Sequence, residues 1–164
     1  MAVQDTLNFV QLTDRVGTSG QPTAAQFADI AAAGYRAVVN LALANSDNAI
    51  ADEGGVVTGL RLSYFHLPVL FDAPQLSELR TFIGLMRVLE DRPVWVHCAM
   101  NLRVSAFMYH YLRHDLELPE AQARSPVFKR WEPRMDAVWR DFLAIPAAAL
   151  ALPPRPASGS TPTV

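Results

Sequence analysis

One stretch near the middle of the chain combines residues that could handle an anion. Cys98, the only cysteine, follows a run of β-branched and aromatic residues that ends in His97. A short loop with Arg103 comes next, and an apolar helix is predicted to begin at Ser105. Such a loop aims the cysteine and several backbone N–H groups at a helix N-terminus, where anions bind and a thiolate is favoured over a thiol. The sequence therefore predicts a nucleophilic thiolate that handles phosphate.

This segment resembles the signature of the cysteine-dependent protein tyrosine and dual-specificity phosphatases, in which five residues separate His-Cys from Arg and then Ser or Thr. Here four residues separate Cys98 from Arg103, while Ser105 keeps the family's distance and Val104 stands where the family has arginine. Asn101 replaces the usual glycine, and Asn tolerates a left-handed backbone better than most residues. Either the loop is one residue shorter, or the arginine has moved one place, which on a helix rotates a side chain by about 100°.

A loop with four intervening residues also occurs in two relatives, the phosphatase-like domain of bacterial beta-lactamase-hydrolase-like proteins and rhodanese. The chain resembles the first over residues 14–112, and the likeness extends to segments 18–23 (TSGQPT), 34–41 (GYRAVVNL) and 66–69 (HLPV). Rhodanese shares only the loop length. The resemblance therefore favours the shorter loop, in which Arg103 faces the anion.

The resemblance also implies a role for each residue of the loop. Cys98 would be the nucleophile, and Arg103 would bind the phosphoryl oxygens through its planar guanidinium. Backbone amides would bind the remaining oxygens, and the phosphate-binding residues are then Ala99, Met100, Asn101, Leu102, Arg103 and Val104. His97 would hold the loop, and Ser105 could cap the helix, donate to the thiolate, or do both.

A phosphatase of this type needs a general acid to protonate the leaving oxygen. In the family, this aspartate lies in the loop after the preceding strand, and Asp72 occupies such a loop before Pro74. The alternative is that Asp72 caps the next helix or forms a turn. Three acidic residues of another loop are weaker candidates, namely Asp47, Asp52 and Glu53.

Two other sets of residues could serve the site. Gln21, Asn40 and Asn45 fall near strand or loop ends, where they could line a pocket or satisfy backbone groups. A basic cluster with an aromatic residue, made of Lys129, Arg130, Trp131 and Arg134, could attract an anionic phosphopeptide or form an ordinary solvated helix junction.

The predicted activity is hydrolysis of phosphomonoesters through a cysteinyl-phosphate, without metal or organic cofactor, on a phosphorylated protein or small molecule. One alternative is a rhodanese-like sulfurtransferase that carries a persulfide on Cys98. The other is a phosphate-binding pseudophosphatase, disabled because Val104 replaces the arginine. The four histidines have no paired ligand spacing, so no metal site is predicted.

The composition fits a compact cytoplasmic enzyme. The 164 residues suffice for one domain, with 51% hydrophobic and 18% charged residues. A net charge of −2 gives no argument for nucleic-acid or membrane binding. A single cysteine excludes an internal disulfide, which suits a reducing compartment, and the N-terminus lacks a secretory signal. The sequence leaves the oligomeric state open.

Strand and helix patterns alternate along the chain. Strands are predicted at 8–12, near 16, at 35–43, 62–69 and 93–97, and helices at 23–33, 50–59, 75–90, 105–112, 119–128 and 133–143. This order predicts a three-layer α/β fold, with a mostly parallel sheet between helices and a ligand site beyond the carboxyl ends of the strands. Residues 1–146 are predicted to form one phosphatase-like domain, and residues 147–164 a tail rich in Ala and Pro. Residues 147–152 could extend the last helix by a turn, and disorder is predicted from Pro153 onward.

Overall fold

A central sheet of five strands organises the computed structural model, which describes residues 2–156. The strand order is β1-β2-β5-β3-β4, and only β1 runs antiparallel to its neighbour, so the predicted α/β class is confirmed. The strands are β1 (Val10–Gln11), β2 (Val16–Ser19), β3 (Ala37–Asn40), β4 (Ser63–His66) and β5 (Val94–His97).

The register of the parallel strands brings polar residues to one edge of the sheet. His97 ends β5 and pairs with Ser19 at the end of β2 and with Asn40 at the end of β3. Asn40 in turn pairs with His66 at the end of β4. Because ligands of such sheets gather beyond the carboxyl ends of the strands, this edge is where a site is expected.

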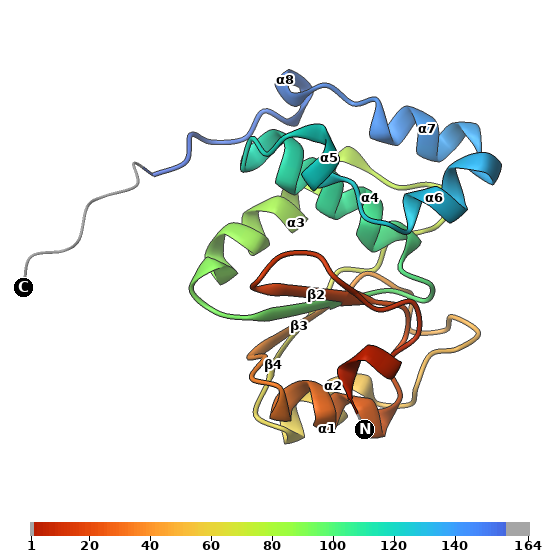
Figure 1. The fold of residues 1–164 in the computed structure, drawn as a ribbon, viewed down its shortest axis with the longest axis vertical. Coiled ribbons are helices and arrows are strands. Elements are labelled where there is room, and N and C mark those ends of the chain that lie inside the picture. The colour runs from red at the N-terminus through yellow and green to blue at the C-terminus, as the bar shows by residue number, and fades with distance from the viewer. Residues whose placement is uncertain (1, 157–164) are drawn as a thin grey trace, which may run out of the picture.

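Helices cover both faces of the sheet (Figure 1). One face packs against α1 (Ala24–Ala32) and α2 (Glu53–Gly59), and the other packs against α3 (Leu76–Val88) and α4 (Leu102–His110). The remaining helices lie beyond α3 and α4, and they are α5 (Glu120–Ala123), α6 (Phe128–Trp131), α7 (Ala137–Leu143) and α8 (Ala147–Leu150). Strand residues alternate between the two cores, as period-two geometry requires: Val38 and Trp95 face α1 and α2, whereas Val39 and Val96 face the other side.

The start of α4 differs from the prediction in a way that matters for the site. The helix begins at Leu102, three residues earlier than expected, because Asn101 adopts the left-handed conformation (φ 67°, ψ 13°) and turns the chain directly from the loop into the helix. Ser105 is therefore inside the helix, and its predicted role as the N-cap is wrong. Asn101 thus adopts the left-handed backbone conformation that its residue type was predicted to tolerate.

Two other helix predictions need correction. The helix predicted at 119–128 is divided into α5 and α6, because Pro126 restricts Ser125 to non-helical conformations. The helix predicted from 133 begins at Ala137, where Asp136 caps it by accepting a hydrogen bond from the backbone N–H of Trp139 at 3.0 Å. Pro133 lies before it, in a short 3₁₀ turn (Glu132–Arg134).

The helical turn predicted within residues 147–152 is present as the separate helix α8, but the disorder predicted from Pro153 does not hold for residues 153–156, which pack on the domain. Leu150 of α8 is 1% exposed, and Arg80 donates to its carbonyl at 2.8 Å. Arg155 forms ion pairs with Glu90 and Asp115, both at 2.6 Å. Residues 157–164 of the predicted tail lie outside the described residues. None of the helices in the described range has the length and apolarity needed to cross a bilayer.

Candidate active site

The loop that follows β5 turns its carbonyl groups outward. The carbonyl of Ala99 accepts hydrogen bonds from the backbone N–H of Gln21 at 3.1 Å and from Asn48 Nδ2 at 3.0 Å. The carbonyl of Met100 accepts from Asn8 Nδ2 at 3.1 Å. These contacts hold the segment that we call the Cys98 loop (residues 98–104) against β2, the N-terminal segment and the loop after β3.

Several backbone N–H groups of the same loop are left without protein partners. Cys98 N donates to the carbonyl of Ser19 at 3.3 Å, and Ser105 N donates to the carbonyl of Asn101 at 3.3 Å. Between them, an antiparallel bridge pairs Met100 with Gly20, while the N–H groups of Ala99 and of residues 102–104 find no acceptor among residues 2–156. Consecutive free amides at the positive end of a helix form an anion-binding cradle.

Asn101 shapes the cradle from its middle. Its Nδ2 donates to the carbonyl of Asn8 at 2.9 Å and to Thr18 Oγ1 at 3.2 Å, so both strand β2 and the N-terminal segment hold the left-handed turn. Ser105 Oγ donates to the carbonyl of Asn101 at 2.6 Å. Since a hydroxyl has one proton, Ser105 braces the turn in this structure and does not donate to the thiol of Cys98.

Cys98 is 1% exposed and lies at the base of the loop, supported from below by His97. The side chain of His97 is fully buried, and both its ring nitrogens face oxygen atoms. Nδ1 lies 3.2 Å from the carbonyl of Cys98, and Nε2 lies 2.8 Å from Glu53 Oε2. This geometry places His97 where it can hold the loop, as the resemblance implied, and it links the cysteine to a buried carboxylate.

Glu53 is the centre of a polar cluster that sequence reasoning undervalued. It is 8% exposed at the start of α2, and besides His97 it accepts from Gln21 Nε2 (2.5 Å), Asn40 Nδ2 (3.0 Å) and Tyr64 Oη (2.9 Å). Burial disfavours the carboxylate, but the hydrogen bonds from His97, Gln21 and Tyr64 outweigh it and lower the pKa of Glu53. The carboxylate is thus stabilised as an acceptor that positions His97, and it is not a proton donor to a leaving group.

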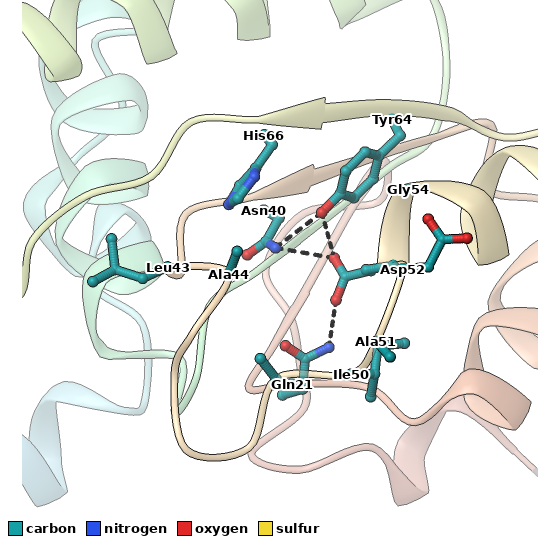
Figure 2. Close-up of a pocket in the computed structure, with 12 residues that line it drawn as sticks. Gln21, Asn40, Leu43, Ala44, Ile50, Ala51, Asp52, Gly54, Tyr64 and His66 are labelled. Atoms are coloured by element: carbon teal, nitrogen blue, oxygen red, sulfur yellow. Dashed lines mark hydrogen bonds between the residues drawn. The ribbon is translucent and has the colours of Figure 1, made fainter.

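The same cluster forms one wall of a cavity of about 270 Å³ at the carboxyl ends of β3 and β4. Figure 2 shows Gln21, Asn40 and Tyr64 converging on the hydrogen-bonded carboxylate, with Leu43 and Ala44 on the opposite side. The sequence signal for Gln21 and Asn40 was their position near strand or loop ends. Their common partner Glu53 comes from a helix, which no local pattern indicates.

Arg103 is 6% exposed and is held in one orientation. Its Nη1 donates to the carbonyl of Val69 at 2.8 Å, and its guanidinium carbon lies 5.8 Å from the centre of the Phe71 ring. Nε is buried and has no partner among the described residues. A buried donor without an acceptor is costly, so this edge of the guanidinium is available to an oxygen atom of a ligand.

Val104, at the position of the family's arginine, is fully buried in the core that α3 and α4 share. An arginine there would point into apolar side chains. The positions of Arg103 and Val104 fit the shorter loop. Because the helix also starts earlier, Arg103 lies in its first turn at the Cys98 loop, and Val104 faces the core.

Asp72 lies in the exposed loop between β4 and α3. Gln75 and Glu78 form the capping box of α3, so the alternative that Asp72 caps this helix is wrong. Asp72 does lie in a turn before Pro74, which the N–H of Ala73 closes by donating to the carbonyl of Leu70 at 3.2 Å. The carboxylate of Asp72 makes no hydrogen bond to another residue in the range 2–156. Arg103 holds the start of this loop through Val69, and Trp139 Nε1 donates to the carbonyl of Phe71 at 2.8 Å. The acid candidate is therefore free on a loop that is anchored to the Cys98 loop.

Of the other two acidic candidates, one caps a helix and the other is exposed in a loop. Asp52 accepts from the backbone N–H of Gly55 at 3.2 Å and caps α2. Asp47 is exposed in the loop after β3. Neither contacts the Cys98 loop through a hydrogen bond in the described part of the chain.

A parallel sheet with a cysteine below a ring of free amides and a buried arginine at a helix start defines the class of cysteine-dependent phosphatases. Residues 4–124 match the family described as "DSP-PTPase phosphatase fused to NAD+ Kinase". The chain belongs to this family, and its class of enzyme is the phosphoric monoester hydrolases of the protein tyrosine phosphatase type. A comparison with curated proteins gives no match.

Solved structures show the same fold. A protein of Shewanella putrefaciens CN-32 described as a "Putative phosphatase (DUF442)" is 29% identical, with a TM-score of 0.79 over 87% of this chain and 92% of that one. P. aeruginosa TpbA in complex with pTyr is 18% identical, with a TM-score of 0.59 over 71% and 69%. The core catalytic domain of the S. cerevisiae PP-IP phosphatase SIW14 is 11% identical, with a TM-score of 0.68 over 85% of both chains. The last two show similarity of fold alone.

Proposed function

We propose that the protein hydrolyses phosphomonoesters through a phosphorylated Cys98. The observation that carries the proposal is the combination of the free amides of Ala99 and of residues 102–104 with the buried Nε of Arg103, which has no partner among the described residues. Amides and guanidinium together can bind the three equatorial oxygens of a transferring phosphoryl group. A cradle built to bind an oxyanion around a nucleophile is what this reaction requires.

The reaction has two steps in this site. In the first, the Cys98 thiolate attacks phosphorus in line with the ester oxygen, the S–P bond forms, and the P–O bond to the leaving group breaks while Asp72 gives that oxygen a proton. In the second, the Asp72 carboxylate takes a proton from water as the water oxygen attacks phosphorus. The S–P bond then breaks, inorganic phosphate leaves, and the thiolate is regenerated. His97 and Glu53 position the loop and take no part in proton transfer.

The substrate class is a phosphorylated protein or small molecule. The relatives' descriptions name a complex with pTyr for TpbA and a PP-IP phosphatase for SIW14. A cradle of backbone amides binds the phosphoryl group itself, so it is compatible with different phosphorylated substrates. We propose a cytoplasmic setting, since a lone functional thiol requires a reducing compartment.

Turnover of a small aryl phosphate tests the proposal. We expect the wild type to release phosphate, vanadate to inhibit it, and Cys98→Ser to abolish turnover while the thermal unfolding midpoint stays close to that of the wild type. A rapid acid quench should trap a phosphate adduct on the peptide that contains Cys98. Absence of turnover with tight oxyanion binding would indicate a pseudophosphatase, and sulfur transfer from thiosulfate to cyanide would indicate a rhodanese-like enzyme.

A further inference from the structure

A second cavity adjoins the Cys98 loop on the side of α6. Its volume is about 280 Å³, and Met100 and Leu102 of the loop form part of its wall. Trp131 and Val127 are the apolar residues of the opposite wall, and the remaining lining residues are Asn8, Arg130 and Arg134. The cavity is lined by two cations and by no acidic residue, next to the loop in which the phosphoryl group would bind.

The two arginines of this cavity are not neutralised by the described part of the protein. Arg130 and Arg134 are exposed, and neither forms an ion pair with an acidic residue in the range 2–156. Glu132, the acidic residue between them in sequence, is paired with Arg124 instead. Two exposed cations without counter-charges produce a positive potential at the cavity mouth.

A short chain of hydrogen bonds ties one of these arginines to the catalytic loop. Arg130 Nη1 donates to Asn8 Oδ1 at 3.3 Å, and Asn8 Nδ2 donates to the carbonyl of Met100 at 3.1 Å. Asn8 also accepts, through its backbone carbonyl, from the side chain of Asn101 at 2.9 Å. Arg130 is therefore positioned relative to the same loop segment whose amides form the cradle.

The aromatic residue of the cavity links it to the loop of the acid candidate. Trp131 is 3% exposed, and its ring lies 6.3 Å from that of Phe71, next to Asp72. Trp131 also packs against Trp139, whose indole N–H donates to the carbonyl of Phe71. The basic cavity thus borders the cradle at Met100 and packs against the loop that carries Asp72.

We infer that this cavity is a second anion subsite, which selects substrates that carry a further phosphate close to the phosphate that is hydrolysed. The inference rests on the proposed function, because it assigns the substrate class of that same site. A planar guanidinium binds phosphate through two N–H groups, and two arginines beside an apolar floor suit a phosphate attached to an aliphatic or aromatic skeleton. A monophosphate would fill the cradle and leave this cavity empty.

The test compares matched substrates that differ only in the second phosphate. One arm uses peptides with a single phosphotyrosine against peptides with an added phosphothreonine one, two or three residues away. The other arm uses a sugar monophosphate against the corresponding bisphosphate. We expect the wild type to prefer the bisphosphorylated member of at least one pair by about tenfold or more in kcat/KM, the scale of one charge-assisted hydrogen bond.

Single substitutions locate that preference. Arg130→Ala and Arg134→Ala should each lower the ratio of kcat/KM for the bisphosphorylated over the monophosphorylated substrate toward one. Lys129→Ala is the matched control, because Lys129 is an exposed cation on the same helix that does not line the cavity, and it should leave the ratio unchanged. Added salt should also reduce the ratio, since the arginines are exposed.

Equal kcat/KM values within every pair, or a preference that survives both arginine substitutions, would overturn the subsite. Failure of the proposed function looks different, because the wild type would then hydrolyse no phosphate ester at all. In that case the subsite is tested by titrating the Cys98→Ser protein with the same peptides. Tighter binding of the bisphosphorylated peptide that depends on Arg130 and Arg134 supports it, and equal binding refutes it.

Discussion

Replacing Arg103 tests the central feature of the site, the displaced arginine. In the structure its Nη1 is committed to the carbonyl of Val69, and its buried Nε has no partner among the described residues. If that edge binds the transferring phosphoryl group, Arg103→Ala removes at least one preorganised donor. The loss of one such donor costs about 100-fold to 1,000-fold in rate, so kcat/KM should fall by at least about 100-fold.

Two further variants separate charge, geometry and folding. Arg103→Lys keeps the charge but loses the planar pair of donors, and we expect it to recover only a small part of the lost activity. Arg80→Ala is the matched control, because Arg80 also donates to backbone carbonyls. Its acceptors are Leu150 and Ala149 of α8, which do not belong to the site. It should lower stability by about 1–3 kcal/mol without the loss of rate.

The assay is steady-state hydrolysis of an aryl phosphate together with the affinity for vanadate. A transition-state contact predicts that vanadate affinity falls in parallel with kcat/KM in Arg103→Ala, whereas a purely structural role would lower the unfolding midpoint and leave vanadate affinity intact. Val104→Arg should destabilise the protein, since Val104 is fully buried. An active Arg103→Ala protein together with an activity gain in Val104→Arg would refute this interpretation of the loop.

Three other predictions follow from the polar groups around the site and the core. Asp72→Asn should lower kcat by about 100-fold on alkyl phosphates and by less on nitrophenyl phosphate, whose leaving group needs no proton, while the exposed Asp47→Asn changes neither; equal losses on both substrates would argue against an acid role. Glu53→Gln should lower the free energy of unfolding by roughly 3 kcal/mol at neutral pH. Because the pKa of Glu53 is lowered in the folded protein, this difference should shrink as pH falls below the ordinary glutamate value of about 4.3, as followed by urea unfolding; a constant difference down to pH about 3 would contradict the assignment. Burial lowers the pKa of His110 to about 4, so the unfolded chain binds its proton first and stability should fall by up to about 3 kcal/mol as pH drops from about 6.5 to about 4. His110→Gln should lose that pH dependence, and an unchanged slope would show that another group titrates.

The layout of the fold could be predicted because each element carries its own local signal. Thr23 and Gln26 form the capping box of α1, and Gly34, with φ of 100°, ends that segment as expected. The strand from Val94 to His97 is apolar on both faces because helices cover both. These signals act within a few residues, and so the sequence alone determined the order of strands and helices and the position of Cys98 at a strand end.

The sequence indicated helical structure near the C-terminus, but it did not indicate how the last residues attach to the domain. Tertiary contacts, not local propensity, place α8: Arg80 holds its carbonyls, and Leu150 is buried against the domain. Composition indicated disorder from Pro153 onward, because a run of Pro and Ala carries no sign of Arg87, Glu90 and Asp115, the partners that hold residues 153–155.

In the site, too, some features follow from the local sequence and others from tertiary contacts. The left-handed conformation of Asn101 was predictable from its residue type, whereas the start of α4 at Leu102 was not, and the roles of Cys98 and Arg103 stay predictions. Only the tertiary structure decided that Val69 occupies one edge of the arginine. It also brought Glu53, the first residue of α2, within 2.8 Å of His97 at the end of β5. Such partners are chosen by the packing of whole elements, and no pattern within one element contains that information.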